Sequence, residues 1–247
     1  MKNLILVRHG QSQWNLENRF TGWKDVSLTK LGIEEAKYSA KIILENKYNI
    51  QSVHTSLLNR AIETTHIISK LISYPKSNIK KIWRLNERHY GSLEGLNKSE
   101  TAKKYGEDQV KIWRRSFDVA PPQLEINDIR HPKNISKFSN LQCKLPVGES
   151  LQDVIIRLEP FLTNYFDFIK KNQGDHLVIA HSNSLRAIVK ILENLSDEEI
   201  IEVNIPTGVP LVYSLDNNLN ILDKKYLIDD ETLNKKKTII ENQGKIK

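Results

Sequence analysis

The sequence has little of what membrane, disulfide-bonded or thiolate-metal proteins require. Its single cysteine, Cys143, cannot form an internal disulfide or a thiolate metal cluster, which predicts a reduced, cytoplasmic setting. The longest apolar runs, such as residues 4–7, are only a few residues long, whereas a membrane span needs about twenty. Arg8 ends the first of these runs, so the apolar core of a secretory signal is also lacking. We therefore expect no membrane partner.

Aromatic residues make up only 7% of the 247 residues, and basic residues outnumber acidic ones. The formal net charge of +7 favours an anionic partner, either nucleic acid or a small phosphorylated molecule, but a solvated face or a mobile tail explains most of the excess lysine. A nucleic-acid module needs base-stacking aromatics among its basic residues or a groove-entering helix, and the sequence shows neither pattern. The small phosphorylated molecule is therefore favoured, and we expect no nucleic-acid partner.

What the chain does contain is an alternation of short buried strands and amphipathic helices, in a composition that is 39% hydrophobic. The pattern predicts strands over residues 3–7, 52–55, 79–83 and 176–180, and helices over residues 31–46, about 61–72, 150–171 and 184–193. This alternation is typical of an α/β three-layer sandwich, with helices on both faces of a mostly parallel sheet. A hairpin predicted over residues 211–227 would add an antiparallel edge strand.

One segment breaks the alternation. Residues 119–148 contain prolines at 121, 122, 132 and 146 and show no periodicity. Because no comparable break separates two cores, we interpret this segment as an insertion over one end of the sheet, and residues 1–247 as a single domain. The helix predicted over 31–46 is expected to bury one stripe of residues, namely Leu31, Ala36, Ala40, Ile43 and Leu44.

Polar side chains follow each of the four predicted parallel strands. Arg8 and His9 follow the first strand, and His181 follows the fourth. Ligands of open α/β sheets bind outside the carboxyl ends of the strands, so the two histidines are expected to face one another. Arg60 opens the helix after the second strand, and Glu87 follows the third. Four segments that are distant in the sequence are therefore expected to converge on one pocket.

These side chains together suit phosphoryl transfer. A neutral imidazole, with an unperturbed pKa near about 6.5, is a competent nucleophile toward phosphorus. Arg8 and Arg60 can donate hydrogen bonds to phosphoryl oxygens. His181 can also donate to these oxygens as negative charge develops on them in the transition state. Glu87 can move a proton to or from a hydroxyl group. The histidines lack the i, i+4 spacing and the carboxylate cluster of a metal site, so we expect no metal.

Longer motifs make the sequence recognisable. Residues 6–10, Leu-Val-Arg-His-Gly, resemble the signature of the histidine phosphatase superfamily. The segments that closely resemble the cofactor-dependent phosphoglycerate mutases are residues 15–23, 85–91, 95–98, 113–115 and 204–213. The resemblance covers nearly the whole chain and implies the fold and activity of that family.

The resemblance also implies a role for each matching residue. His9 would be the phosphorylated nucleophile and Glu87 the proton donor and acceptor. Arg8, Arg60 and His181 would clamp the phosphoryl group. The residues implied to contact the phosphoglycerate or its carboxylate are Asn15, Thr21, Gly22, Tyr90, Lys98, Arg114, Arg115, Ser182 and Asn183. A substrate that carries a phosphate and a carboxylate needs a second cationic group. Lys98, Arg114 and Arg115 supply it.

The implied reaction interconverts 3-phosphoglycerate and 2-phosphoglycerate, in glycolysis and gluconeogenesis, through a phosphohistidine primed by 2,3-bisphosphoglycerate. A mobile C-terminal tail, residues 238–247, would close over the site and exclude water. A homodimer or homotetramer is compatible with the resemblance. Two alternatives stay open: a phosphatase or a bisphosphoglycerate synthase or phosphatase of the same superfamily, and a non-catalytic descendant that binds an anion.

Two positions depart from the family pattern. Gln11 stands where many members have glutamate, which changes the local charge by one. Ser182 stands where the family has glycine. Glycine adopts backbone conformations that strain other residues, so we expect a strained backbone and weakened catalysis at Ser182.

Overall fold

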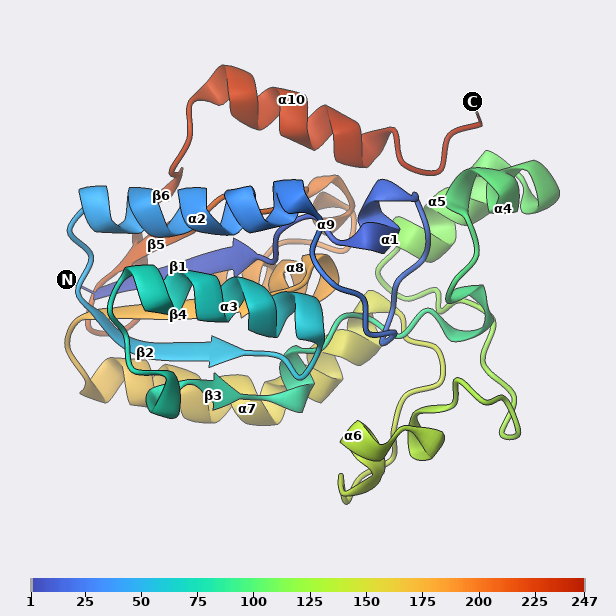
Figure 1. Ribbon diagram of the computed structural model, residues 1–247, viewed down its shortest axis with the longest axis horizontal. Helices are drawn as coiled ribbons and strands as arrows, with labels where there is room; N and C mark the ends of the chain where they lie inside the picture. Colours follow the sequence, from blue (N-terminus) through green and yellow to red (C-terminus); the bar gives the residue numbers. More distant parts are fainter. Residues whose placement is uncertain (1, 247) are drawn as a thin grey trace.

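The computed structural model describes residues 2–246 and contains one six-stranded mixed sheet. Its strands are β1 (Lys2–Arg8), β2 (Ile50–Thr55), β3 (Lys80–Lys81), β4 (Asp175–Ala180), β5 (Leu211–Leu215) and β6 (Ile221–Tyr226). The strand order is β3-β2-β4-β1-β5-β6, and the first four strands in this order are parallel (Figure 1). The predicted hairpin is confirmed, with β5 pairing antiparallel to β1 and β6 at the edge.

Ten α-helices occur in residues 2–246. They are α1 (Gln13–Leu16), α2 (Lys30–Glu45), α3 (Asn59–Leu71), α4 (Lys98–Tyr105), α5 (Glu107–Arg115), α6 (Ser136–Ser139), α7 (Leu151–Lys171), α8 (Ser182–Glu193), α9 (Glu199–Glu202) and α10 (Asp230–Glu241). Short 3₁₀ turns cover Lys76–Asn78, Trp83–Leu85, Gly91–Leu93 and Pro132–Asn134.

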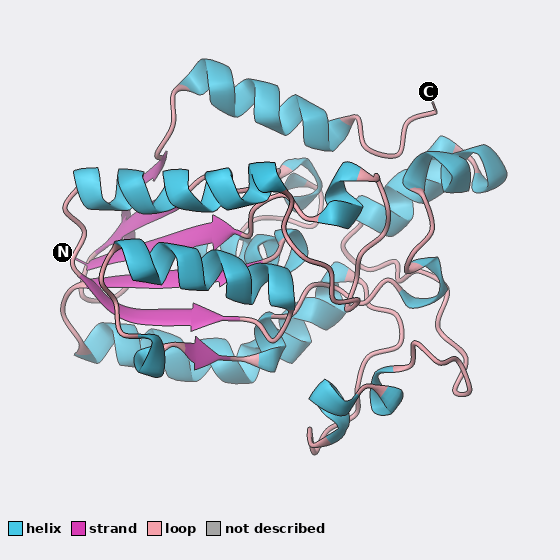
Figure 2. Ribbon diagram, in the orientation of Figure 1, coloured by secondary structure: helices cyan, strands magenta, loops and turns pink. Residues whose placement is uncertain are grey.

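The sheet lies between two layers of helices, as the sequence predicts (Figure 2). Side chains of a strand point alternately to its two faces. In β1, Ile5 and Val7 pack in the core beneath α2 and α3, while Leu4 and Leu6 pack in the core beneath α7 and α8. All four side chains are buried. A strand buried on both faces explains the continuous apolar run at this position.

The helix predicted over residues 31–46 forms as α2, but its buried stripe differs from the predicted one. Ala36, Ala40 and Ile43 are buried, whereas Leu31 and Leu44 are 53% and 49% exposed. Small residues dominate the buried face, so α2 packs closely on the sheet and on α3. The two leucines lie outside that narrow face.

The third predicted strand, residues 79–83, is also shorter than expected. Only Lys80 and Lys81 pair with β2, and the backbone then turns into the 3₁₀ segment that begins at Trp83. The Ile82 N–H still bonds the Thr55 carbonyl at 2.7 Å. The turn leads the chain across the carboxyl edge of the sheet, which brings Glu87 to that edge.

The course of the chain opens a crevice between β1 and β4. The helices that follow β1 and β2 cover one face of the sheet, whereas α8, which follows β4, covers the other (Figure 1). The connections leaving β1 and β4 therefore diverge, and such a switch point is where α/β sheets bind ligands. The His9 N–H bonds the Ala180 carbonyl at 3.0 Å, so the two strand ends lie side by side.

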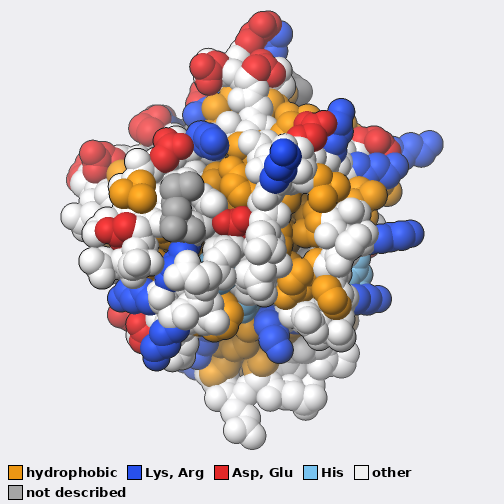
Figure 3. All heavy atoms as spheres, turned by 90° about the vertical axis from the view of Figure 1, so that its left-hand side faces the viewer, with side chains coloured by type: hydrophobic (Ala, Val, Ile, Leu, Met, Phe, Trp, Pro, Cys, Tyr) orange, Lys and Arg blue, Asp and Glu red, His pale blue; other side chains and the backbone are white. Residues whose placement is uncertain are grey.

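Residues 119–148 contain little regular structure besides α6 and one 3₁₀ turn. Phe138 from this segment is buried against Trp23 and Leu58, near the carboxyl end of the sheet. No helix among residues 2–246 is long and apolar enough to cross a bilayer. On the face of the molecule where the parallel strands begin, away from their carboxyl ends, Lys and Arg side chains are spread among Asp and Glu side chains (Figure 3).

The loop over residues 21–24 is held from two sides. Arg60 donates to the carbonyls of Gly22 and Lys24, at 2.9 and 3.0 Å. The carboxylate of Glu94 accepts the backbone N–H groups of Trp23 and Lys24, at 3.0 and 3.2 Å. Burial raises the pKa of Glu94 to about 7, although these N–H groups and the charges of Arg130 and Arg60 oppose the shift. The loop therefore rests on a buried carboxyl group that titrates near neutral pH.

We expect Glu94→Gln to change how stability depends on pH. Between about pH 4.5 and 7 the folded protein keeps a proton on Glu94 that the unfolded chain releases, so this group makes stability fall as pH rises. The gap between the two proteins, defined as the free energy of unfolding of Glu94→Gln minus that of the wild type, should therefore increase by roughly 2 to 4 kcal/mol from about pH 4.5 to 7. Urea unfolding at pH 4.5, 6 and 8 measures the gap.

Glu125→Gln is the matched control. The Glu125 side chain is exposed, so its carboxylate is hydrated in the folded and unfolded states alike. The gap between this variant and the wild type should stay constant with pH. A gap for Glu94→Gln that is equally constant would show that Glu94 does not titrate as its burial predicts.

Candidate active site

His9 is a buried imidazole with a defined tautomer. Its Nδ1 lies 2.7 Å from the Gly10 carbonyl oxygen, which can only accept, so Nδ1 carries the proton. Nε2 therefore keeps its lone pair and accepts from the Arg60 Nε at 3.1 Å. Burial, reinforced by the charges of Arg60 and Arg8, holds the pKa of His9 well below its usual range. The ring is neutral near pH 7 and presents a nucleophilic nitrogen.

His181 lies against His9, as predicted from the two strand ends. The ring centroids are 4.9 Å apart, and both residues are buried. The His181 Nε2 pairs with the Ser56 hydroxyl at 2.7 Å, while Nδ1 has no partner among residues 2–246. Burial, followed by the charges of Arg60, His9 and Arg8, lowers the pKa of His181. An unpartnered buried nitrogen next to the nucleophile is suited to bind an incoming oxygen.

Arg8 is anchored by only part of its guanidinium group, whereas each of the three guanidinium nitrogens of Arg60 donates a hydrogen bond, to His9, Lys24 and Gly22. Arg8 Nη1 donates to the Ile205 carbonyl at 3.0 Å, and its buried Nε has no partner among the described residues. Burial lowers the pKa of Arg60 to about 10 and also lowers that of Arg8. Two desolvated cations beside a neutral imidazole strongly favour the binding of an anion.

Glu87 is held by backbone groups at the edge of the crevice. Its carboxylate accepts the N–H of Arg88 at 2.8 Å and that of Asn183, in the first turn of α8, at 3.1 Å. Its own carbonyl accepts from the Trp23 indole at 2.6 Å and from Arg157 at 3.3 Å. These contacts fix the carboxylate between the two histidine-bearing strand ends and the outer cationic residues.

A cavity of about 50 Å³ lies at this edge of the sheet. It is lined by Arg8, Asn15, Arg19, Thr21, Glu87, Tyr90, Lys98, Arg114, Arg115, Ser182, Asn183, Ile240 and Gln243. His9 and His181 are chain neighbours of the lining residues Arg8 and Ser182 and contact each other, Arg60 contacts His9, and Gly22 contributes the carbonyl that anchors Arg60. The structure thus brings together all the residues singled out from the sequence.

The outer part of the cavity is strongly cationic and is covered by the C-terminal tail. Lys98 is buried, and burial together with the nearby charge of Arg114 lowers its pKa well below the usual range. Its Nζ donates to the Gln243 side chain at 3.0 Å, and Arg114 donates to the Ile240 carbonyl at 3.3 Å. A second cavity of about 400 Å³ adjoins the first and shares Arg114, Arg115 and both tail residues with it.

The prediction of a strained backbone at Ser182 is wrong. The helix predicted to begin at residue 184 begins at Ser182, so this residue has a helical backbone and is not among those with positive φ. His181 supplies the extended residue before the helix, with φ −123° and ψ 168°. A serine in the first turn of a helix is accommodated without strain.

The tail predicted over residues 238–247 starts inside a helix. Residues 238–241 complete α10, and residues 242–246 pack against α4 and α5 through Lys98, Ser99 and Glu107. Lys247 lies outside the described residues. The tail is closed over the cavity in this structure.

Sequence reasoning missed the buried charges that hold the site from behind. Arg157 pairs with Glu149 at 2.7 Å, with both side chains about 5% exposed or less. Glu149 in turn accepts the His89 N–H at 2.7 Å, and Arg186 holds the Asn183 side chain at 3.0 Å. A signal was present: Arg157 sits on the apolar stripe of α7, between Val154 and Leu158. A charge on a buried helix face requires a buried partner.

The donor set fits a phosphorylated anion better than a metal ion. No group of three or more His, Cys, Asp or Glu side chains in residues 2–246 is arranged to hold a metal. The cavity instead offers arginines, a lysine and amide side chains, which are donors to phosphate and carboxylate oxygens.

Comparison with known proteins agrees with this geometry. The histidine phosphatase superfamily (branch 1) matches residues 4–222. The chain is 51% identical to a 2,3-bisphosphoglycerate-dependent phosphoglycerate mutase of Treponema denticola, over 99% of both chains. It is 50% identical to one of Hydrogenobaculum sp., over 99% of this chain and 100% of the relative.

Among solved structures, a mycobacterial glucosyl-3-phosphoglycerate phosphatase has the same fold. Its TM-score is 0.71 at 19% identity, covering 93% of this chain and 99% of that one. Full-length identity near one half, the superfamily match and the paired histidines at the β1 and β4 ends lead to one conclusion. The chain belongs to the histidine phosphatase superfamily and, within it, to the family of 2,3-bisphosphoglycerate-dependent phosphoglycerate mutases.

Proposed function

We propose that this protein interconverts 3-phosphoglycerate and 2-phosphoglycerate through a phosphohistidine on His9, in glycolysis and gluconeogenesis. One observation carries the proposal: the buried, neutral His9 accepts from Arg60 and directly follows Arg8, which lines a cavity that also contains a second group of cations. The inner cations suit the reacting phosphoryl group. Lys98, Arg114 and Arg115 suit the other charged end of a phosphoglycerate.

The residues present fit 2,3-bisphosphoglycerate as the priming molecule. Its several negative charges would satisfy the unpartnered nitrogens of Arg8 and His181 and stabilise the desolvated Lys98 ammonium. When bound, it supplies the phosphoryl group that primes the enzyme. Asn15, Thr21, Gly22, Tyr90, Ser182 and Asn183 complete the proposed binding set, by side-chain or backbone contacts.

The chain's own residues perform the transfer as follows. His9 Nε2 forms a bond to phosphorus while the bond from phosphorus to the leaving oxygen breaks, and Glu87 gives that oxygen a proton. In the return step Glu87 takes the proton of the attacking hydroxyl, whose oxygen bonds to phosphorus as the P–Nε2 bond breaks. Arg8, Arg60 and His181 stabilise the charge on the phosphoryl oxygens in both steps.

Two features favour a mutase over a plain phosphatase of the superfamily. The second cationic group has no use in hydrolysing a simple phosphate ester. The cavity of about 50 Å³ beneath the tail also leaves little room for bulk water beside a phosphohistidine. The full-length relatives named as mutases support the same choice over a non-catalytic anion-binding protein.

We extend the proposal to location and assembly. The single cysteine, Cys143, is free and exposed, which suits the reducing cytoplasm. We propose no nucleic-acid or membrane partner, and either a homodimer or a homotetramer. Light scattering of the purified protein separates these two assemblies.

His9 is expected to be the phosphorylated residue. Incubation with 2,3-bisphosphoglycerate followed by intact-mass and peptide analysis should place an acid-labile adduct on His9. His9→Ala should abolish turnover and keep the fold, whereas His66→Ala, on α3 and outside the cavity lining, should retain both. An adduct on another residue, or none while substrate binds, would contradict the mechanism.

Activity is expected to survive treatment with a metal chelator, because arginine, lysine and histidine supply the positive charge that a metal would otherwise provide. Vanadate should inhibit, since it can take the five-coordinate geometry of the transferring phosphoryl group. Assays of dialysed enzyme with and without chelator test this. Activity lost in chelator and restored by a divalent metal is the outcome that would refute it.

Arg114→Ala is expected to weaken mutase activity more than hydrolysis of a phosphate ester that lacks a carboxylate. A charge-assisted contact of about 1.5 to 3 kcal/mol corresponds to a loss on the order of tenfold or more. Lys111→Ala is the control, because Lys111 lies on the same helix but lines only the second cavity, of about 400 Å³. Equal losses in both assays would assign Arg114 a general structural role.

A further inference from the structure

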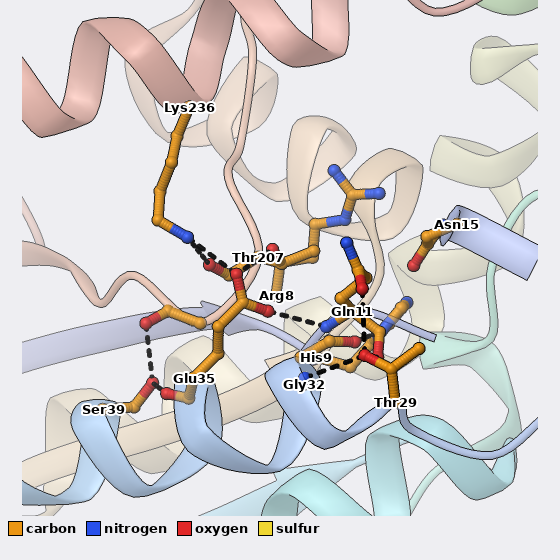
Figure 4. Close-up of polar contacts among 12 residues, drawn as sticks. Arg8, His9, Gln11, Asn15, Thr29, Gly32, Glu35, Ser39, Thr207 and Lys236 are labelled. Atoms are coloured by element: carbon orange, nitrogen blue, oxygen red, sulfur yellow. Dashed lines mark hydrogen bonds and ion pairs between the residues drawn. The ribbon is translucent and has the colours of Figure 1, made fainter. Parts of the chain in front are cut away.

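Lys236, on α10, forms an ion pair with Glu35 on α2, two elements distant in the sequence (Figure 4). Its Nζ lies 2.7 Å from the Glu35 Oε1 and 3.5 Å from the Thr207 carbonyl. The Lys236 side chain is 27% exposed and that of Glu35 only 9%. This contact is therefore partly shielded from water. A charge-assisted bond is stronger in such a partly buried environment than on the surface.

Glu35 joins three segments that border the site. Its Oε2 accepts the backbone N–H of Gln11 at 2.7 Å, two residues after His9 (Figure 4). Its Oε1 accepts the Thr207 hydroxyl at 2.7 Å as well as the Lys236 ammonium. Thr207 is paired with Arg8 in a parallel bridge. One carboxylate therefore connects the His9 loop, the strand end at Arg8 and the C-terminal helix.

Lys236 precedes the part of the chain that covers the cavity. Ile240, one turn farther along α10, and Gln243, just after the helix, both line it. α10 runs across α2 toward α5, so its position decides where these two residues lie (Figure 1). A cavity of about 50 Å³ is too small to admit a ligand such as 2,3-bisphosphoglycerate while this cover is closed.

We propose that Lys236 is a positioning residue of the transfer reaction, whose ion pair with Glu35 seats α10 so that Ile240 and Gln243 keep water from the phosphorylated His9. The inference rests on the proposed function, because it requires a phosphohistidine to protect. With α10 displaced, water attacks phosphorus, the P–Nε2 bond breaks, and inorganic phosphate leaves a neutral His9. Lys236 thus favours transfer to a hydroxyl over hydrolysis.

The same helix supplies a matched control. Lys235 pairs with Glu231 at 2.6 Å within α10, and both side chains are more than 70% exposed. This pair joins two residues of one helix, and within residues 2–246 neither side chain forms a hydrogen bond or ion pair with another element. Lys235→Met therefore removes a lysine and an ion pair of similar length without releasing α10 from α2.

Lys236→Met keeps the aliphatic stem and removes the charge. Its ratio of phosphoenzyme hydrolysis to mutase turnover is expected to rise roughly tenfold or more, the equivalent of one charge-assisted contact. His9 should still be phosphorylated by 2,3-bisphosphoglycerate. Backbone amides of residues 240–246 should lose protection from hydrogen exchange in the unliganded protein. Lys235→Met should match the wild type in all three measurements, and Lys236→Arg should restore most of the wild-type ratio.

The outcomes separate the inference from the function on which it rests. A Lys236→Met protein with the wild-type ratio and wild-type amide protection would overturn the inference. The same change in ratio in Lys235→Met would also overturn it, because loss of charge on α10 would then suffice. A wild-type protein that forms no adduct on His9 would overturn the proposed function instead, and the exchange comparison would still show whether the ion pair seats α10.

Discussion

The parallel pairing of β1 with β4 is the constraint on which the site depends. Arg8 and Ala180 are register partners, and the His9 N–H continues the ladder by bonding the Ala180 carbonyl. This pairing brings His9 and His181 within contact of each other although they are far apart in the chain. Because the following helices cover opposite faces, the two loops separate and leave a crevice. The other polar segments then converge on this edge of the sheet.

The electrostatics of the crevice are unbalanced in a way that only an anion corrects. Among the described residues that line the smaller cavity, Glu87 is the one carboxylate, set against four arginines and Lys98. Burial lowers the pKa values of Arg8, Lys98 and Arg114, because removal from water disfavours their charged forms. A ligand with several negative charges reverses that effect. The ion pair of Arg157 with Glu149 is buried behind the site, and Arg157 also donates to the Glu87 carbonyl, so these charges hold the Glu87 segment in place.

Much of the fold could be predicted because its strands and helices have strong local patterns. β1 is apolar on both faces, and Ser150 begins α7 with a reciprocal capping box to Asp153. Where prediction failed, contacts distant in the sequence decided the outcome. Leu31 and Leu44 match a helical stripe, yet α2 packs through its small residues, which permit a closer approach to the sheet. No local pattern reveals how near two elements will lie.

The sequence by itself determined the strand and helix alternation, the histidines and arginines at the strand ends, and the motifs shared with the phosphoglycerate mutases. These follow from residue types at fixed spacing, which side-chain periodicity and strand direction translate directly into position. Only the tertiary structure decided that the backbone at Ser182 is helical and unstrained, and which nitrogen of His9 carries the proton. It also decided that Lys236 reaches Glu35. Each of these depends on which groups meet across the fold, because hydrogen bonds and desolvation act through distance in space.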